Sequence, residues 1–166
     1  MAYDASTRAL PRRAVIDIKG TRDDVLPRLR SLGLDIPQPG RLARSGELEL
    51  LQAGPEHWLL LAPEPLEAQL LASQNPLPMA TDTLVLAVSD CYQFLAVDGP
   101  HARDLLAIAC PLDLDHSVFP ADGATFTEAF GQKALLLRRG AGFELAFESS
   151  HGDYIQAYFS RVNPQP

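Results

Sequence analysis

The stretch from Val85 to Pro120 places the strongest constraint on the fold of this chain. It begins inside an apolar run, residues 84–88, which predicts a buried strand. The turn-prone pair Ser89-Asp90 follows, and residues 92–97, whose side chains alternate between two faces, predict a second strand. Two strands joined by a sharp turn therefore lie in the middle of the sequence, and the rest of the chain has to pack around them.

The segment after these strands predicts a short amphipathic helix. Asp98 or Gly99 suits the N-cap, and Pro100 suits the first turn, where its missing N–H costs nothing. The apolar residues follow the i, i+3, i+4, i+7 spacing of one helix face: Ala102, Leu105, Leu106 and Ala109. Cys110-Pro111 should end the helix, because the residue before a proline avoids the α region. The two leucines of that face are therefore predicted to be core residues.

The region before this stretch predicts alternating strands and helices after a flexible N-terminal arm. Residues 1–13 show no periodicity and are expected to be mobile, and in a complex they could lie on a partner. Strands are predicted at 14–20, 47–53 and 58–61, helices at 21–33 and 65–73, and loops at 35–46 and 74–79.

The helix predicted at 21–33 has two possible N-cap residues, Thr21 and Asp24. Thr21 with Asp24 forms a capping box, but this choice leaves Pro27 inside the helix at a cost of about 3 kcal/mol. A cap at Asp24 keeps Pro27 in the first turn and avoids most of that cost.

The region after Pro120 predicts three strands and a final helix. The strands are expected at 124–130, 133–138 and 143–148, and Ser150 with Asp153 is expected to cap the helix. The order is then β-α-β-β-α-β followed by β-α-β-β-β-α, so the two halves resemble variants of one β-α-β-β-α-β-like unit. We expect one α+β domain, residues 14–166, with halves 14–89 and 90–166 that share a core, and helices packed on antiparallel-rich sheets.

Charge and composition exclude several classes of function. The net charge is −7, with 14 Lys and Arg against 21 Asp and Glu, which argues against a nucleic-acid partner. No apolar run approaches the roughly 20 residues needed to span a bilayer, and residues 1–13 lack the apolar core of a signal peptide. We therefore expect a cytoplasmic protein without a membrane partner, in which Cys91 and Cys110 are reduced and mostly buried.

The sequence contains no catalytic or cofactor motif. No G-x-S-x-G elbow, G-x-G-x-x-G loop or phosphate-binding P-loop occurs. The four histidines are scattered, and none pairs with another at i, i+4. Residues 113–116, Asp-Leu-Asp-His, could supply metal ligands, but they better suit a solvated turn whose leucine packs on the core, because a metal site needs three or four converging ligands. We expect no catalytic, cofactor-binding or metal-binding residue on this chain.

Three blocks of the sequence carry a family resemblance. They are "SD…DGPHARDLLAIACPLDLDHSVFP" from Ser89, "LGLDIPQPGRLARSGELELLQAGPEHWLLLAP" over 32–63, and the weaker "FELAFESSHGDYIQAYF" near the C-terminus. Together they resemble the gamma subunit of heterotetrameric sarcosine oxidase. That resemblance implies the aminomethyltransferase-like fold of the glycine-cleavage T-protein.

The resemblance also implies where the chemistry lies. Sarcosine oxidases of this type carry FAD, FMN, NAD and tetrahydrofolate on other subunits, and the gamma subunit has no assigned cofactor. The chain is therefore expected to be a non-catalytic subunit that joins alpha, beta and delta partners in the oxidative demethylation of sarcosine or a related N-methyl amine. The alternative is a stand-alone folate-binding, aminomethyltransferase-like protein.

Two positions depart from the family pattern. Ala87 and Tyr92 stand where many relatives have an acid and an arginine. The loss of both charges together suits the replacement of a buried ion pair by apolar groups. It leaves open which N-methyl amine the complex would oxidise.

A subunit that holds partners needs an apolar patch with a polar rim. Residues 1–13, the Pro-rich loop 35–46 and residues 111–120 are the three candidates. In the last segment the candidate partner interface consists of Leu112, Leu114, Val118 and Phe119. Packing of the same residues over the sheet is the alternative, and the sequence does not decide between the two.

Overall fold

The computed structural model describes residues 3–74 and 82–164. Most of the loop expected at 74–79 lies outside the described residues. The chain divides into two compact units, one of residues 12–89 and one in which residues 1–11 join residues 90–166. They are called the 12–89 unit and the 90–166 unit below.

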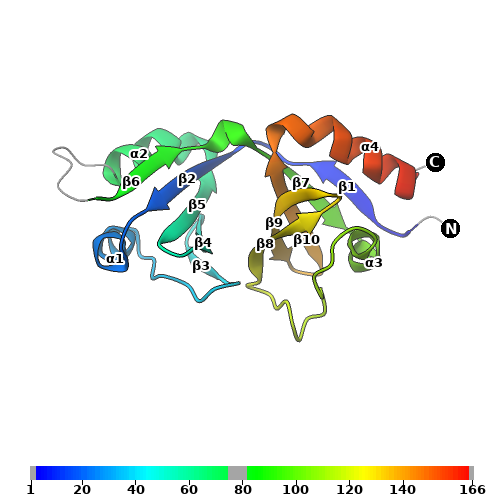
Figure 1. Cartoon of the computed structure of the whole chain (residues 1–166), viewed down its shortest axis with the longest axis horizontal. Coiled ribbons are helices and arrows are strands. Elements are labelled where there is room, and N and C mark those ends of the chain that lie inside the picture. Colours follow the sequence, from blue (N-terminus) through cyan, green and yellow to red (C-terminus); the bar gives the residue numbers. More distant parts are fainter. Residues whose placement is uncertain (1–2, 75–81, 165–166) are drawn as a thin grey trace. The chain divides into compact units, whose positions relative to one another are not determined.

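The 12–89 unit is a five-stranded sheet with two helices (Figure 1). The strands are β2 (Arg13–Lys19), β3 (Leu42–Ser45), β4 (Leu48–Gly54), β5 (His57–Pro63) and β6 (Leu84–Ala87), and the helices are α1 (Arg22–Ser31) and α2 (Glu67–Gln74). Their order in the sheet is β3-β4-β5-β2-β6, and every recorded pair of neighbours is antiparallel.

The 90–166 unit has the same composition of elements. Its strands are β1 (Ser6–Ala9), β7 (Tyr92–Asp98), β8 (Ala124–Ala129), β9 (Gln132–Arg139) and β10 (Gly142–Glu148), and its helices are α3 (Ala102–Ala107) and α4 (Gly152–Val162). The order is β1-β7-β10-β9-β8, again with antiparallel neighbours. The predicted α+β class with antiparallel-rich sheets is confirmed.

The two units share one topology, and this explains the place of the N-terminal strand. In the 12–89 unit the chain runs β2-α1-β3-β4-β5-α2-β6, and the last strand pairs with the first. In the 90–166 unit it runs β7-α3-β8-β9-β10-α4, and the strand that pairs with β7 is β1. β1 thus takes in one sheet the position that β6 takes in the other. The sheet of the 90–166 unit is therefore completed by a strand from the N-terminal end of the chain.

The expectation of a flexible N-terminal arm is wrong for residues 6–9. They pair with β7 in the register Ser6↔Asp98 to Ala9↔Leu95. All four residues of β1 are exposed, so the strand has no buried face and therefore none of the alternation by which strands are recognised. Its formation depends on the open edge of β7, which lies about 90 residues away in sequence.

Residues before β1 are also held in place, by polar contacts. The buried side chain of Asn163 accepts from the N–H of Tyr3 at 2.8 Å and donates to the carbonyl of Ala5 at 2.8 Å. Asp4 donates its N–H to Nδ1 of His101 at 3.0 Å. The segment is therefore an integral part of the 90–166 unit.

The central helix begins later than expected. α3 starts at Ala102, because residues 99–101 receive the N-terminal segment. The N–H of His101 donates to the carbonyl of Asp4 at 3.1 Å. Gly99 has φ +114°, and a Cβ there would lie 2.7 Å from the same carbonyl oxygen, so no larger residue fits.

Two further strands differ from expectation. Residues 42–45, predicted as loop, form the short edge strand β3. The run 84–88, predicted as a buried strand, forms the edge strand β6, in which Val85 is buried while Leu84 and Leu86 are 43% and 47% exposed. An apolar run does not show whether a strand is central or at an edge, because that depends on its neighbours.

The capping-box solution for α1 is the one adopted. Thr21 is the N-cap, its side chain accepts from the N–H of Asp24 at 3.3 Å, and Pro27 lies inside the helix. The final helix lacks the predicted cap, because α4 begins at Gly152 after a 3₁₀ turn at 149–151, with no side-chain cap.

Each unit has its own cluster of buried apolar side chains. In the 90–166 unit, α3 and α4 pack on β7, β10 and β9, and Leu105 and Leu106 are fully buried, as predicted. In the 12–89 unit, Val25 and Leu29 of α1 and Leu70 of α2 pack on Ile16, Ile18 and Leu60 of the sheet.

Candidate functional site

The 111–120 loop carries the interface residues predicted from the sequence, and most of them point inward. Leu114 and Phe119 are buried in the hydrophobic cluster of the 90–166 unit, and Leu112 packs partly against it. Of the two alternatives left open by the sequence, the burial of Leu114 and Phe119 favours packing over the sheet of their own unit. Val118, at 57% exposed, is the member of the set that remains open to solvent.

Arg138 of β9 explains why the loop packs inward. Its buried guanidinium donates from Nε to the carbonyl of Phe119 at 3.1 Å, and from Nη2 to the same oxygen at 2.8 Å. Nη2 also donates to the carbonyl of Leu114. The guanidinium carbon lies 4.4 Å from the ring centre of Phe143 and 5.7 Å from that of Phe119. Burial lowers the pKa of Arg138, and the nearby Asp115 carboxylate opposes this shift. One cation thus satisfies two loop carbonyls that the apolar packing removes from water.

The tip of the loop is closed by Asp115. Its carboxylate accepts from the N–H of Ser117 at 3.0 Å and from the Ser117 hydroxyl at 2.7 Å. Nη1 of Arg103 lies 3.2 Å away. The hydrogen bonds from Ser117, helped by Arg103, hold the pKa of Asp115 below its usual value. Asp113 in turn accepts from the N–H of Asp115 at 2.9 Å.

These contacts favour a turn over a metal site at residues 113–116. Both carboxylates are used in hydrogen bonds within the loop. Within residues 3–74 and 82–164, no three His, Cys, Asp or Glu side chains are grouped so that they could hold a metal ion.

The sheet of the 12–89 unit carries two polar clusters that the sequence reasoning missed. Glu49 of β4 lies between two arginines, with Arg13 at 2.8 Å and Arg44 at 3.0 Å. Asp17 of β2 lies 2.7 Å from Nε2 of His57 and 3.5 Å from the amino group of Lys19. The alternation in residues 14–20 places Asp17 and Lys19 on one face, but only the register with β5 shows that His57 lies beside them.

The Asp17–His57 pair lacks the remaining parts of a catalytic site. The two atoms are close enough for an ion pair, although their hydrogen-bond geometry is poor. Among the described residues no serine, threonine or cysteine bonds to the pair, so no nucleophile is positioned next to it. The cluster at Glu49 consists of a buried carboxylate whose charge is balanced by two arginines.

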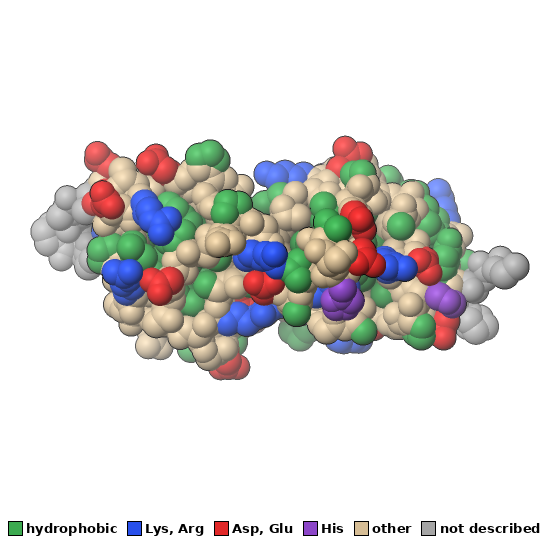
Figure 2. All heavy atoms as spheres, turned by 90° about the horizontal axis from the view of Figure 1, so that it is seen from below, with side chains coloured by type: hydrophobic (Ala, Val, Ile, Leu, Met, Phe, Trp, Pro, Cys, Tyr) green, Lys and Arg blue, Asp and Glu red, His purple; other side chains and the backbone are tan. Residues whose placement is uncertain are grey.

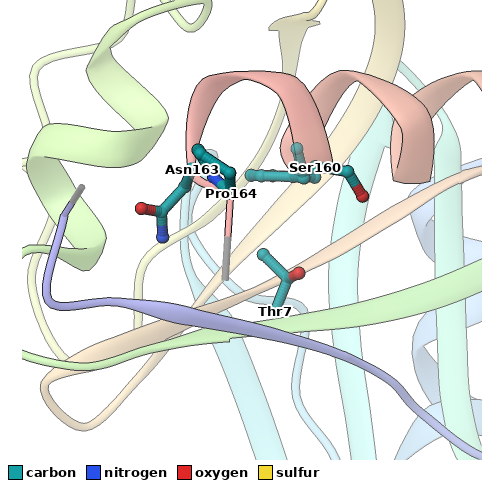
Figure 3. Close-up of a pocket in the computed structure, with 5 residues that line it drawn as sticks. Thr7, Ser160, Asn163 and Pro164 are labelled. Carbon is teal, nitrogen blue, oxygen red and sulfur yellow. The ribbon is translucent and has the colours of Figure 1, made fainter. Parts of the chain in front are cut away.

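A cavity of about 270 Å³ lies where β1 meets the end of α4 (Figure 3). It is lined by Thr7, Phe159, Ser160, Asn163 and Pro164. The Ser160 hydroxyl donates to the carbonyl of Gln156 at 2.9 Å, and both polar atoms of the Asn163 amide bond to residues 3 and 5. The lining residues include no charged side chain. The cavity therefore fits a packing gap beside the N-terminal segment better than a reaction site.

A second cavity, of about 250 Å³, lies on the 90–166 unit and is lined by Cys91, Tyr92, Phe126, Lys133 and Glu148. The expectation that both cysteines are mostly buried is wrong for Cys91, which is exposed, while Cys110 is buried. The amino group of Lys133 lies 4.5 Å from the ring centre of Phe126. This contact already gives the lysine an aromatic partner within the chain.

Charged side chains do not gather by sign on the surface shown in Figure 2, where Lys and Arg are interspersed with Asp and Glu. An extended basic patch of the kind that binds a phosphate backbone is not seen on the described residues of that face. None of the helices in residues 3–74 and 82–164 is long and apolar enough to cross a membrane.

Comparison with protein families identifies the chain. The model of the "Sarcosine oxidase, gamma subunit family" matches residues 26–163, which is most of the sequence. The chain belongs to this family. No curated protein matches the sequence.

Two solved structures resemble this gamma-family chain in fold. One is described as "Heterotetrameric Sarcosine Oxidase from Corynebacterium sp. U-96 in complex with pyrrole 2-carboxylate", with TM-score 0.83, 20% identity, and coverage of 98% of this chain and 87% of that chain. The other is the glycine cleavage system aminomethyltransferase T from Bartonella henselae, with TM-score 0.71 and 18% identity. This second match covers 96% of this chain but 46% of that one. The fold is therefore aminomethyltransferase-like, as predicted.

The structure shows where the two residues that depart from the family's sequence pattern lie. In this gamma-family chain, Ala87 is the last residue of β6 and Tyr92 is the first residue of β7. Ala87 is exposed at the edge of its sheet, and Tyr92 lines the second cavity. The interpretation that apolar groups replace a buried ion pair here is therefore wrong, because Ala87 is exposed and Tyr92 is half-buried.

Proposed function

We propose that this chain is a non-catalytic subunit of a heterotetrameric sarcosine-oxidase-like complex. The observation that carries the proposal is the family match over residues 26–163, together with a structural match that covers 98% of this chain and 87% of the other. The complex would demethylate sarcosine or a related N-methyl amine by oxidation and pass the one-carbon unit to tetrahydrofolate. Its flavins, nicotinamide cofactor and folate would be bound by the alpha, beta and delta partners.

The chemistry of the described residues supports a structural role. The buried guanidinium of Arg138 serves the 111–120 loop, the buried Glu49 is paired with Arg13, and the half-buried Asp17 is paired with Lys19. The first cavity is lined by no charged side chain, and in the second no hydrogen bond among the described residues joins the Cys91 thiol to Lys133 or Glu148. What this chain supplies to the proposed complex is therefore a folded surface.

The second candidate function is a stand-alone folate-binding protein. The likeness to aminomethyltransferase T favours it at the level of the fold. Fold alone is weak support, because functional sites differ among proteins that share a fold. Three cavities of the described residues, of about 250, 270 and 300 Å³, also lie at or below the lower end of the size range of ligand sites.

Ligand measurements on the isolated chain distinguish these two functions. The purified protein should show no flavin absorbance in the visible range, and calorimetric titration with tetrahydrofolate should show no saturable heat. An aminomethyltransferase from a glycine cleavage system would serve as the positive control for the titration. Stoichiometric folate binding by the isolated chain would favour the stand-alone function. Stoichiometric flavin would contradict the non-catalytic role.

A further inference from the structure

β6 is one of the two edge strands of the sheet in the 12–89 unit, and β3 is the other. β6 pairs with β2 in the register Ile16↔Ala87 to Lys19↔Leu84, and it is an end strand of the sheet (Figure 1). On its other side, no strand among the described residues hydrogen-bonds to it.

Along β6 the main-chain N–H and C=O groups alternate between facing β2 and facing the open edge of the sheet. The N–H of Val88 donates to the carbonyl of Val15 at 2.8 Å. Because residues of an antiparallel pair alternate between bonded and non-bonded positions, Leu86 and Leu84 also bond toward β2. Val85 and Ala87 then direct their N–H and C=O groups toward the open edge. These groups are those that an added strand would pair with.

The side chains of β6 leave this edge without the usual protection. Edge strands are commonly guarded by charged side chains that discourage pairing with another chain. Three edge strands of the described chain carry one, namely Arg8 in β1, Arg44 in β3 and Glu128 in β8. The sequence of β6 is LVLA, with no charge.

The exposed leucines of β6 form an apolar pair on one face. Leu84 and Leu86 are two of five large apolar residues recorded as exposed, and they are two residues apart, so they share a face of the sheet. The other three are Ile108, Val118 and Tyr154, which lie in the 90–166 unit. The pair thus lies beside the unprotected main chain of the same strand.

We propose that β6 is a docking edge at which an extended segment of a partner subunit adds a sixth strand to the sheet. The inference rests on the proposed function, since the segment belongs to another chain of the complex. Its main chain pairs with Val85 and Ala87, and its alternate apolar side chains contact Leu84 and Leu86. The main-chain pairing supplies affinity and the leucines supply register.

A second copy of this chain is a poorer occupant. A stable dimer buries about 800 Å² on each partner, and a four-residue strand with two exposed leucines does not approach that area by itself. The net charge of −7 also opposes the approach of two copies. A segment of a partner that is held by other contacts as well does not have to meet either requirement.

The test is the substitution Ala87→Pro. Proline is tolerated on an edge strand where the N–H faces outward, and Ala87 is exposed, so the pairing of β6 with β2 is kept. The tagged variant is co-expressed with the candidate large subunits, and the amount of large subunit recovered per tagged chain is measured. We expect recovery to fall about tenfold, because the partner's carbonyl is left without its donor.

The matched control is Glu128→Pro on the edge strand β8. Gly123 accepts from the N–H of Arg138 at 2.9 Å, so by the same alternation the N–H of Glu128 faces outward. This variant should recover the large subunits as the unmodified chain does. The double variant Leu84→Lys, Leu86→Lys provides a second test that leaves the main chain intact. It should reduce recovery as Ala87→Pro does, and it decides the outcome if the proline variant fails to fold.

The outcomes distinguish this inference from the proposed function. Full recovery by a folded Ala87→Pro chain, or by the double lysine variant, would overturn the docking edge while leaving subunit membership intact. If the unmodified chain recovers no large subunit, the proposed function fails and the inference fails with it. A homodimer of the unmodified chain that Ala87→Pro dissociates would overturn the choice of occupant.

Discussion

Arg138 and Phe119 are joined by two hydrogen bonds, from Nε at 3.1 Å and from Nη2 at 2.8 Å, both to the Phe119 carbonyl. The pair connects β9 to the far end of the 111–120 loop. Because the guanidinium also bonds to the carbonyl of Leu114, it holds both ends of the apolar part of the loop. The segment that looks most like an interface in the sequence is therefore turned into the core of its own unit.

Arg138→Met should lower the free energy of unfolding by about 1.5–3 kcal/mol. The change keeps apolar volume but leaves two buried carbonyls without a charged donor. Chemical denaturation followed by circular dichroism measures the difference. Arg22→Met, at an exposed position in the first turn of α1, is the control and should be nearly neutral. Equal stability of the two variants would show that the Arg138 contacts contribute nothing.

Leu105→Ala should destabilise the protein by about 2–5 kcal/mol, because the side chain is fully buried and its loss leaves a cavity. The measurement is the free energy of unfolding in urea. Ile108→Ala, three residues along and 41% exposed, is the matched control and should cost far less. An unchanged midpoint for Leu105→Ala would contradict the packing of α3 on the sheet.

Asn163→Ala should release the N-terminal segment. The substitution removes the acceptor for the N–H of Tyr3 and the donor to the carbonyl of Ala5. Hydrogen exchange of the β1 amides should accelerate by about tenfold or more, while exchange in β4 stays unchanged. Unaltered exchange in β1 would mean that pairing with β7 alone holds the strand.

The hydrogen bonds between Asp115 and Ser117 at the tip of the 111–120 loop should persist until the pH is low. The pKa of Asp115 lies below its ordinary value in the folded state, so its contribution is complete above the unfolded pKa of about 3.9 and is lost as pH falls through the lower folded value. The amide resonance of Ser117, followed by NMR during acid titration, should keep its hydrogen-bonded shift to below about pH 3.9. In Asp115→Asn this transition should disappear. A transition centred above pH 4 would contradict the hydrogen bonds from Ser117.

The sequence correctly predicted features that depend on residues close together in the chain. The burial of Leu105 and Leu106 follows from helical spacing, and the strands β8, β9 and β10 follow from alternation between turns. It failed where structure depends on a distant partner. β1 has no buried face, and it is a strand only because β7 offers an open edge.

The candidate site shows the same division. The apolar character of residues 111–120 is visible in the sequence, but the direction in which they face is set by Arg138, which lies at least 18 residues further along the chain. The pairing of Asp17 with His57 requires the register of β2 on β5, which periodicity does not supply. The exposure of Leu84 and Leu86 likewise follows from the place of β6 at the end of a sheet.

The proposed function requires that this gamma-family chain binds larger subunits. The most direct measurement is co-expression of the tagged chain with its candidate flavin subunits, followed by purification through the tag. We predict that the large subunits are recovered with the tagged chain in constant proportion, with flavin absorbance and sarcosine-dependent oxidation in the same fraction. Recovery of the tagged chain alone, with the large subunits fully active in its absence, would contradict the account.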